Sequence, residues 1–391
     1  MTTYTEEYLP YCRSESQIAA LKAVVQHGSI RKAAEAIGMN KRNLEKTLAR
    51  IRLEAARYGY SPAHDMTHPC PPTHILKGTS TLYDGNGLLR QQWVKTDRVT
   101  ESLEQTIRAI AEGLMSEVPK VAPVKAPAKA LNADIHNVYV ITDYHLGMYS
   151  WGEETGADWD LDIAERTILD WFRHAIAQAP AAESATFAQL GDFLHWDGLE
   201  ALTPASKHVL DADTRFQKVV RTAIRVIRQI VAMLLAKHQR VTLVMADANH
   251  DPAGGAWLRE MLAVMYEDEP RITVDNSADT YYCQEFGKTA LFFHHGHKRG
   301  PKDLPSVLVA KFREVYGRTK HHYAHTGHLH HDVVRECNLM KTEQHRTLAA
   351  QDAYASRAGY MSGRDAKVIV YHKDHGEVSR ITVSYDMVKA S

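Results

Sequence analysis

The sequence has few cysteines and no long apolar run, and these two absences exclude several classes of protein. Only four of its 391 residues are cysteines and no two form a Cys-x-x-Cys pair, so neither a zinc ribbon nor a disulfide framework is expected. No stretch reaches the roughly 18 uninterrupted apolar residues of a membrane span, and the first residues lack the basic and apolar regions of a secretory signal. We therefore expect a cytoplasmic protein with no membrane partner.

The sequence also lacks a net charge, but the balance conceals two different halves. Its 47 Lys and Arg side chains equal its 47 Asp and Glu side chains. Residues 1–131 hold 18 basic and 13 acidic side chains, whereas the remainder holds 29 basic and 34 acidic ones. Hydrophobic content of 44% and charged content of 24% are typical of a globular protein, which excludes a disordered chain.

A stretch rich in proline, alanine and lysine, residues 119–130, predicts an extended linker between the two halves. Apolar residues at helical spacing in 99–118 predict a helix before it, which packs on the N-terminal domain or, in an alternative, forms a homodimer. We therefore expect two domains, 1–97 and 135–391, joined by a helix and linker at 98–134.

The N-terminal half has the apolar spacing, the capping residue and the turn residue of a small helical domain. Helical apolar spacing recurs in 18–26, 31–37 and 41–56. Ser29 is placed to cap the second helix and Gly38 to form the turn before the third. Residues 27–44 resemble the helix-turn-helix segment of LysR-type DNA-binding regulators, and two apolar runs within 75–94 around Asp84-Gly85-Asn86-Gly87 predict a hairpin that would form a wing.

Basic side chains concentrate in this half: residues 29–60 contain eight Lys and Arg against three acidic residues, which would attract the phosphates of DNA. The residues predicted to contact nucleic acid are Arg31, Lys32, Lys41, Arg42, Asn43 and Lys46. The alternative is a solvated helical bundle that binds no nucleic acid.

Histidine is abundant in the second half, which holds 19 of the chain's 23 histidines after residue 134. Short strand-like runs there repeatedly end in residues that bind metals. The motifs, in order, are Asp143-Tyr144-His145, Gly191-Asp192, Asn249-His250-Asp251, His295-Gly296-His297 and Gly327-His328-Leu329-His330. Helical stretches at 162–179 and 215–238 supply the crossovers of an α/β architecture.

This succession of motifs resembles the calcineurin-like metallophosphoesterase superfamily over residues 135–391. The resemblance implies a four-layer α/β/β/α sandwich, here with a separate winged helix-turn-helix domain. One departure is Ala248, which stands where the superfamily usually places a glycine before Asn-His.

The resemblance also implies two divalent metal ions. Asp143, His145 and His330 would bind one ion. Asn249, His295 and His328 would bind the other, with Asp192 between them. Carboxylate, imidazole and amide ligands without thiolates suit Mn²⁺ best, with Fe²⁺ and Zn²⁺ as alternatives.

By the same resemblance, a hydroxide bridging the two ions attacks the phosphorus atom, and His250 assists the leaving oxygen while Asp251 orients its ring. His195 and His297 are candidates for contacts with the ligands or the substrate. The sequence therefore predicts a two-metal hydrolase of phosphomonoesters or phosphodiesters, most plausibly in DNA, as a nuclease or DNA-end phosphatase. The alternatives are a nucleotide, small-molecule or protein phosphatase, and a DNA-binding regulator with an idle phosphoesterase domain.

Overall fold

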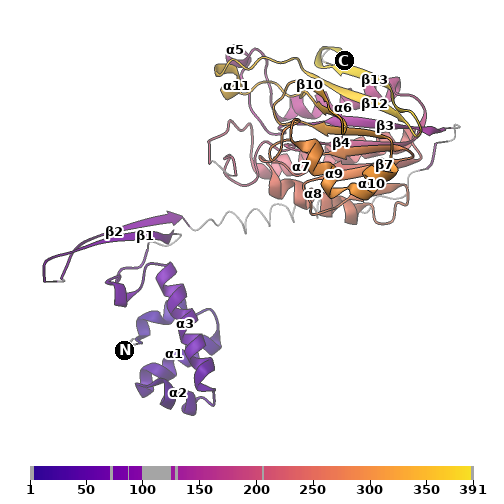
Figure 1. Cartoon of the computed structure of the whole chain (residues 1–391). Helices are drawn as coiled ribbons and strands as arrows, with labels where there is room; N and C mark the ends of the chain where they lie inside the picture. The colour runs from indigo at the N-terminus through magenta and orange to yellow at the C-terminus, as the bar shows by residue number, and fades with distance from the viewer. Residues whose placement is uncertain are drawn as a thin grey trace. The chain divides into compact units, whose positions relative to one another are not determined.

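The computed structural model describes residues 4–70, 74–86, 88–98, 125–127, 131–204 and 207–388. The chain divides into two compact units, residues 1–101 and 102–391 (Figure 1). The helix predicted at 99–118 lies outside the described residues, as does the predicted linker apart from residues 125–127.

Unit 1 begins with a small bundle of helices. Its helical segments are η1 (Glu6–Tyr11), α1 (Glu15–His27), α2 (Ile30–Ala36), α3 (Lys41–Arg57) and η2 (Pro62–His64). The Ser29 side chain accepts a hydrogen bond from the Lys32 backbone, as expected of the N-cap of α2. Gly38 has a φ of +64°, the left-handed conformation that a tight turn before α3 requires. Both predictions for these residues are confirmed, and the small side chains of Ala33 and Ala34 are buried against Leu44.

The remainder of unit 1 is a two-stranded antiparallel ribbon of β1 (His74–Tyr83) and β2 (Leu89–Arg98), as the sequence predicts. Asp84 organises its turn, because the Asp84 carboxylate accepts hydrogen bonds from the backbone N–H groups of Asn86 and Leu88. The Tyr83 hydroxyl donates to Asp65, which ties the tip of β1 to the segment after η2.

Unit 2 contains two mixed β-sheets. The six-stranded sheet has the order β13-β12-β3-β4-β5-β6, and the five-stranded sheet has the order β10-β11-β9-β8-β7. The first sheet consists of β3 (Asn132–Ile141), β4 (Ala182–Gln189), β5 (Arg240–Met245), β6 (Ile272–Asp275), β12 (Asp365–His372) and β13 (Gly376–Ser384). The second consists of β7 (Tyr282–Phe286), β8 (Thr289–Phe293), β9 (His321–Thr326), β10 (Val333–Glu336) and β11 (Lys341–Gln344).

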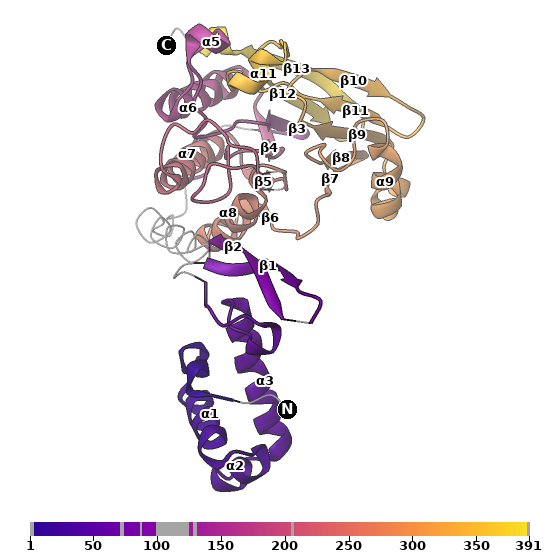
Figure 2. The same cartoon turned by 90° about the vertical axis from the view of Figure 1, so that its left-hand side faces the viewer.

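Helices cover the outer faces of both sheets, and Figure 2 shows the resulting order of layers. The helices of unit 2 are α5 (Gly152–Thr155), α6 (Leu161–Gln178), α7 (Phe216–Lys237), α8 (Pro252–Met265), α9 (Leu304–Lys311), α10 (Arg313–Arg318), α11 (Ala353–Arg357) and α12 (Tyr385–Val388). One core lies between α6, α7, α8 and the larger sheet, a second between the two sheets, and a third between the smaller sheet and α9. The mixed α/β class expected from the sequence is therefore confirmed, with four packed layers.

Strand direction decides where the motifs of unit 2 lie. Strands β3, β4 and β5 are parallel neighbours, so their carboxyl ends lie at one edge of the larger sheet. Strands β8 and β9 are likewise parallel. Every predicted metal-binding motif follows the carboxyl end of one of these five strands. Among the described residues no helix combines the length and the apolar character needed to cross a membrane.

Candidate metal centre

The loops after β3 and β9 bring the first predicted ligand set together. Asp143, His145 and His330 each offer one ligand atom, and these atoms all lie within 4.8 Å of one another. The Nε2 atoms of His145 and His330 are 3.3 Å apart, so the two rings aim at one point. His330 Nε2 lies 3.2 Å from Asp143 Oδ1, a buried oxygen that makes no hydrogen bond in the described part of the chain. Such an orphaned oxygen facing two imidazoles fits a bound cation.

The loops after β4, β8 and β9 form the second set in the same way. Asp192, His295 and His328 also hold their ligand atoms within 4.8 Å of one another. His295 Nε2 is 3.1 Å from Asp192 Oδ2 and 3.0 Å from Asn249 Oδ1. His295 Nε2 also lies 3.9 Å from Asp143 Oδ1, which links the two sets.

Hydrogen bonds from backbone N–H groups and from the Thr142 hydroxyl orient the two carboxylates. Asp143 Oδ2 accepts from the Thr142 hydroxyl at 2.6 Å and from the His328 backbone at 2.8 Å. Asp192 Oδ1 accepts from the backbone N–H groups of Asn249 and His250 at 3.1 and 2.8 Å. Each carboxylate thus keeps its other oxygen for the centre.

Most ligands also have strained backbones. Seven non-glycine residues in the described part of the chain have a positive φ, and five of them are predicted ligands. They are Asp143, His145, Asp192, His328 and His330. Left-handed backbone costs of order 1–3 kcal/mol at a non-glycine residue and persists only where the surrounding structure imposes it. Such strain concentrated on one edge of the sheets makes that edge the candidate functional site.

Opposite charges facing each other shift the pKa values of these groups. Burial would raise the pKa of Asp143, but His330 and His295 lower it below its usual range. Burial would lower the pKa of His295, but Asp192 and Asp143 raise it to about 9. The carboxylates are therefore poised to be ionised, as metal ligands must be.

His250 lies beside the first set, with its ring centroid 4.8 Å from that of His145. Its Nδ1 is 2.9 Å from the carbonyl oxygen of His195, to which it donates. This contact differs from the predicted role of Asp251, whose Oδ2 instead accepts from the Leu194 backbone at 2.8 Å. A backbone carbonyl rather than a carboxylate orients the His250 ring, because the side chain of Asp251, the N-cap residue of α8, accepts a hydrogen bond from the loop after β4 instead.

His195 and His297, the two histidines left open by the sequence, both lie next to predicted ligands. His195 is buried, and its Nδ1 is 3.3 Å from Nδ1 of His145. The His297 ring centroid is 5.3 Å from that of His295, and its Nε2 is 4.0 Å from Asp247 Oδ2. Both positions fit contacts that orient ligands or meet a substrate.

The sequence did not predict the roles of Thr142 and Gly327. Any side chain at Gly327 would overlap the Thr142 hydroxyl and the Asp143 carboxylate, so the β9 loop can approach β3 only with glycine there. The sequence shows a glycine before His-x-His, but it does not show that Thr142 and Asp143 pack against this glycine.

A further histidine group was also not predicted. It consists of His325 on β9, Glu343 on β11 and His345 directly after β11, and all three are buried. Glu343 already makes ion pairs with Lys367 and Arg380 at 3.1 and 2.9 Å. These cations neutralise the carboxylate, so this group is best understood as a buried polar network.

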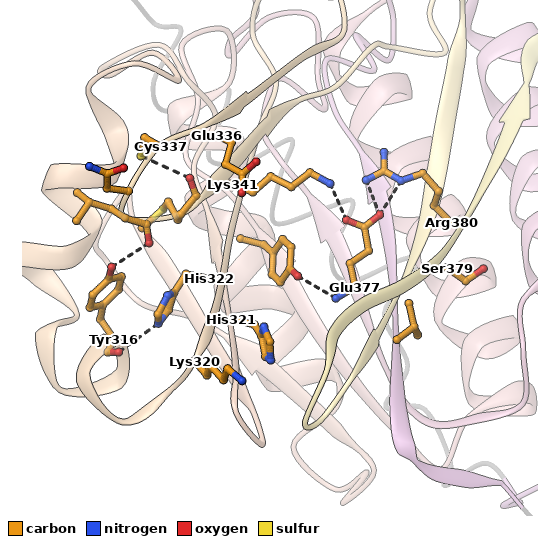
Figure 3. Close-up of a pocket in the computed structure, with 15 residues that line it drawn as sticks. Tyr316, Lys320, His321, His322, Glu336, Cys337, Lys341, Glu377, Ser379 and Arg380 are labelled. Carbon is orange, nitrogen blue, oxygen red and sulfur yellow. Dashed lines mark hydrogen bonds and ion pairs between the residues drawn. The ribbon is translucent and has the colours of Figure 1, made fainter.

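A cavity of about 750 Å³ lies at the other end of β9 from His328 (Figure 3). Its walls include Lys341 and Arg380, and both pair with Glu377, as the dashed lines show. His321, another wall residue, has its Nε2 3.0 Å from the Asp374 carbonyl oxygen. The walls of this cavity therefore include none of the predicted metal ligands, and Glu377 pairs with two of the wall cations.

The predicted nucleic-acid contacts lie on α2 and α3 of unit 1. All six side chains are exposed: Arg31, Lys32, Lys41, Arg42, Asn43 and Lys46. Arg31 and Lys41 pair with Glu35 and Glu45 one turn further along their helices. Exposed pairs of this kind are weak and remain available to an anion.

Comparison with known proteins finds similarity only among solved structures, because no family model and no curated protein matches the sequence. An archaeal phosphodiesterase is 13% identical, and the alignment covers 63% of this chain and 99% of that one with a TM-score of 0.32. A dimetal phosphatase from Danio rerio is 9% identical over 64% of this chain and 99% of its own, also with a TM-score of 0.32. A 5′-nucleotidase from Candida albicans is 12% identical, and the alignment covers 68% of this chain and 55% of that one, again with a TM-score of 0.32. Overlaps this weak carry no functional argument, which rests on the geometry of the site.

Proposed function

We propose that unit 2 is a metal-dependent phosphoesterase that uses two divalent ions. The observation that carries this proposal is the pair of adjacent ligand sets, Asp143-His145-His330 and Asp192-His295-His328, with Asn249 at the second. The donors fit such ions on two grounds. Asp143 Oδ1 is buried and receives no hydrogen bond from any residue that the structure describes, and oxygen and imidazole donors suit Mn²⁺, Fe²⁺ or Zn²⁺. When bound, two such ions activate water and neutralise phosphoryl oxygens.

The residues of the chain supply the remaining functions. Asp192 would be the residue shared by both ions. Its Oδ2 lies 3.1 Å from Nε2 of His295, and the backbone N–H groups of Asn249 and His250 fix the carboxylate through Oδ1. The Nδ1–H group of His250 donates a hydrogen bond to the His195 carbonyl oxygen. Its Nε2 is therefore the nitrogen left to give a proton to a leaving oxygen. His195 thereby positions His250 through its backbone and contacts His145 through its ring.

DNA is the substrate that we propose for this site. Support comes from the exposed basic side chains on α2 and α3, which suit a phosphate backbone, and from the ribbon of β1 and β2 beside them in sequence. A DNA-binding unit tethered to a phosphoesterase raises the local concentration of phosphodiester bonds at the metal centre.

The test is an assay of Mn²⁺-loaded full-length protein on end-labelled single- and double-stranded DNA, with His250→Ala as the matched control. Shortened or dephosphorylated DNA from the wild type, but not from the variant, is the expected result. Intact DNA together with hydrolysis of nucleotide monoesters would replace DNA by a small-molecule substrate. No hydrolysis of any phosphoester by protein shown to hold two ions would contradict the proposal itself and favour a regulator with an idle site.

A further inference from the structure

The loop between β8 and α9 carries three exposed cations as it runs away from the metal centre. It starts after Phe293, passes through the ligand His295 and ends at Leu304. Lys298, Arg299 and Lys302 are exposed along it, and none makes a hydrogen bond or ion pair within the described ranges of the chain.

Nearby cations of the same layer behave differently. Lys311 at the end of α9 pairs with Asp279 at 2.7 Å, and Arg318 at the end of α10 pairs with Glu285 at 2.6 Å. The one acidic residue of the loop is Asp303, which stands at the N-cap position of α9 without a capping hydrogen bond from its side chain. The loop therefore carries three cations against one carboxylate, and such a net positive charge favours the binding of an anion.

Both ends of the loop are fixed. The carbonyl oxygen of His295 accepts from the Gly327 backbone at 2.8 Å, and that of Gly300 accepts from the backbones of Asp303 and Leu304 at 3.1 Å. Lys298 follows His295 by three residues, so their Cα atoms are at most about 11 Å apart. From this distance the Lys298 ammonium group can bind a phosphate next to the phosphate that the metal centre would hold. It does not compete for the same phosphate.

The loop begins in contact with the second ligand set. The His297 ring centroid is 5.3 Å from that of the predicted ligand His295, and Lys298 is the next residue of the chain.

We propose that Lys298, Arg299 and Lys302 bind the phosphates that flank the scissile phosphate in a nucleic-acid strand. The inference rests on the proposed function and names the residues of unit 2 that would hold the substrate strand beside the metal centre. A compound with one phosphoryl group places that group at the metal centre and leaves the loop without a ligand. A strand has a phosphate at every nucleotide, so its neighbours fall within reach of the loop.

The experiment compares two substrates of Mn²⁺-loaded full-length protein: a single-stranded oligodeoxynucleotide and bis(p-nitrophenyl) phosphate, a diester with a single phosphate. The test variant is Lys298→Gln/Arg299→Gln/Lys302→Gln. The matched control is Arg166→Gln/Lys218→Gln/Arg221→Gln, which removes the same charge from exposed positions of α6 and α7 in the opposite helical layer.

The ratio of kcat/KM for the oligonucleotide to kcat/KM for bis(p-nitrophenyl) phosphate is expected to fall about tenfold or more in the test variant, through KM, and to stay unchanged in the control. The slope of log KM for the oligonucleotide against log salt concentration should fall by about 2, since each lost phosphate contact removes about 0.7 for a single strand.

Three outcomes would overturn the inference: an unchanged ratio, an equal fall in the control, or a wild type that hydrolyses bis(p-nitrophenyl) phosphate but not the oligonucleotide. The last result leaves the phosphoesterase proposal standing. Inactivity of the metal-loaded wild type on both substrates would instead overturn the proposed function, and the inference with it.

Discussion

Gly191 and Ala248 share one space between the ends of β4 and β5. A Cβ atom on Gly191 would lie 2.7 Å from the Cβ atom of Ala248 and 2.7 Å from Nδ1 of His295. Gly191 has a φ of +108°, whereas Ala248 has no left-handed backbone. The methyl group of Ala248 is therefore accommodated because the residue opposite it is a glycine.

The first prediction follows from this pair. Gly191→Ala should push His295 out of the second ligand set and force a left-handed alanine, so it should destabilise the protein by about 1–3 kcal/mol and weaken binding of one ion. Metal content by mass spectrometry and the Tm would check this. Ala248→Gly is the control and should keep both ions. Full rescue in the double variant Gly191→Ala/Ala248→Gly would contradict the argument, because the contact with His295 remains in it.

The second prediction concerns His250. Replacing it with alanine should lower kcat on bis(p-nitrophenyl) phosphate by about 10²–10⁴-fold, since a positioned proton donor contributes about that much. Metal content should not change, because His250 belongs to neither predicted ligand set. A variant that retains both ions and full kcat would show that another group protonates the leaving oxygen.

Asp251 supports a contrasting prediction. Burial and the nearby Asp192 raise the pKa of Asp251 well above its ordinary value, and its Oδ2 accepts from the Leu194 backbone. Asparagine retains an oxygen acceptor there without requiring a charge, so Asp251→Asn should keep kcat within about threefold of wild type. A loss as large as that of His250→Ala would show that the carboxylate does act on the ring. Steady-state kinetics of the two variants side by side make the comparison.

Buried histidines predict loss of stability in acid. Burial lowers the pKa of His238 to about 4, and its ring is held by the Tyr139 hydroxyl and the Ala182 carbonyl. In the unfolded chain a histidine has a pKa near 6.5. Between pH 6.5 and 4 the unfolded chain therefore binds more protons at His238 than the folded one, and the free energy of unfolding decreases as the pH falls through that window. Urea unfolding at pH 7 and pH 5 should show a smaller loss for His238→Gln than for wild type, by up to about 1.4 kcal/mol per pH unit. An identical loss in both proteins would rule out His238 as a contributor.

The last prediction concerns unit 1. Lys32→Gln/Arg42→Gln/Lys46→Gln should weaken binding of fluorescent duplex DNA and reduce its salt dependence by about one unit of slope per lost contact. Fluorescence anisotropy measures the binding. Hydrolysis of bis(p-nitrophenyl) phosphate is the internal control and should be unaffected. Unchanged DNA affinity would favour the alternative of a helical bundle that does not bind nucleic acid.

Much of the architecture could be predicted from local signals. Helices at 162–179 and 215–238 are observed as α6 and α7, because their apolar faces repeat at helical spacing. The candidate ligands could be located at one edge because their motifs follow strands, and parallel strands place their carboxyl ends together. Their division between two ions came from the resemblance to a known superfamily. The hydrogen-bond partner of the His250 ring could not be predicted, because that partner is a backbone carbonyl and every residue has one.

The sequence by itself determined which residues can bind metal and that they follow strands, since donor chemistry and apolar periodicity are properties of residue type and order. Only the tertiary structure decided how they meet. The left-handed backbone at Asp143 and Asp192, the close approach of Gly327 to Thr142 and the carbonyl of His195 beside His250 all depend on segments distant in sequence. Packing imposes these contacts, and no local propensity favours them.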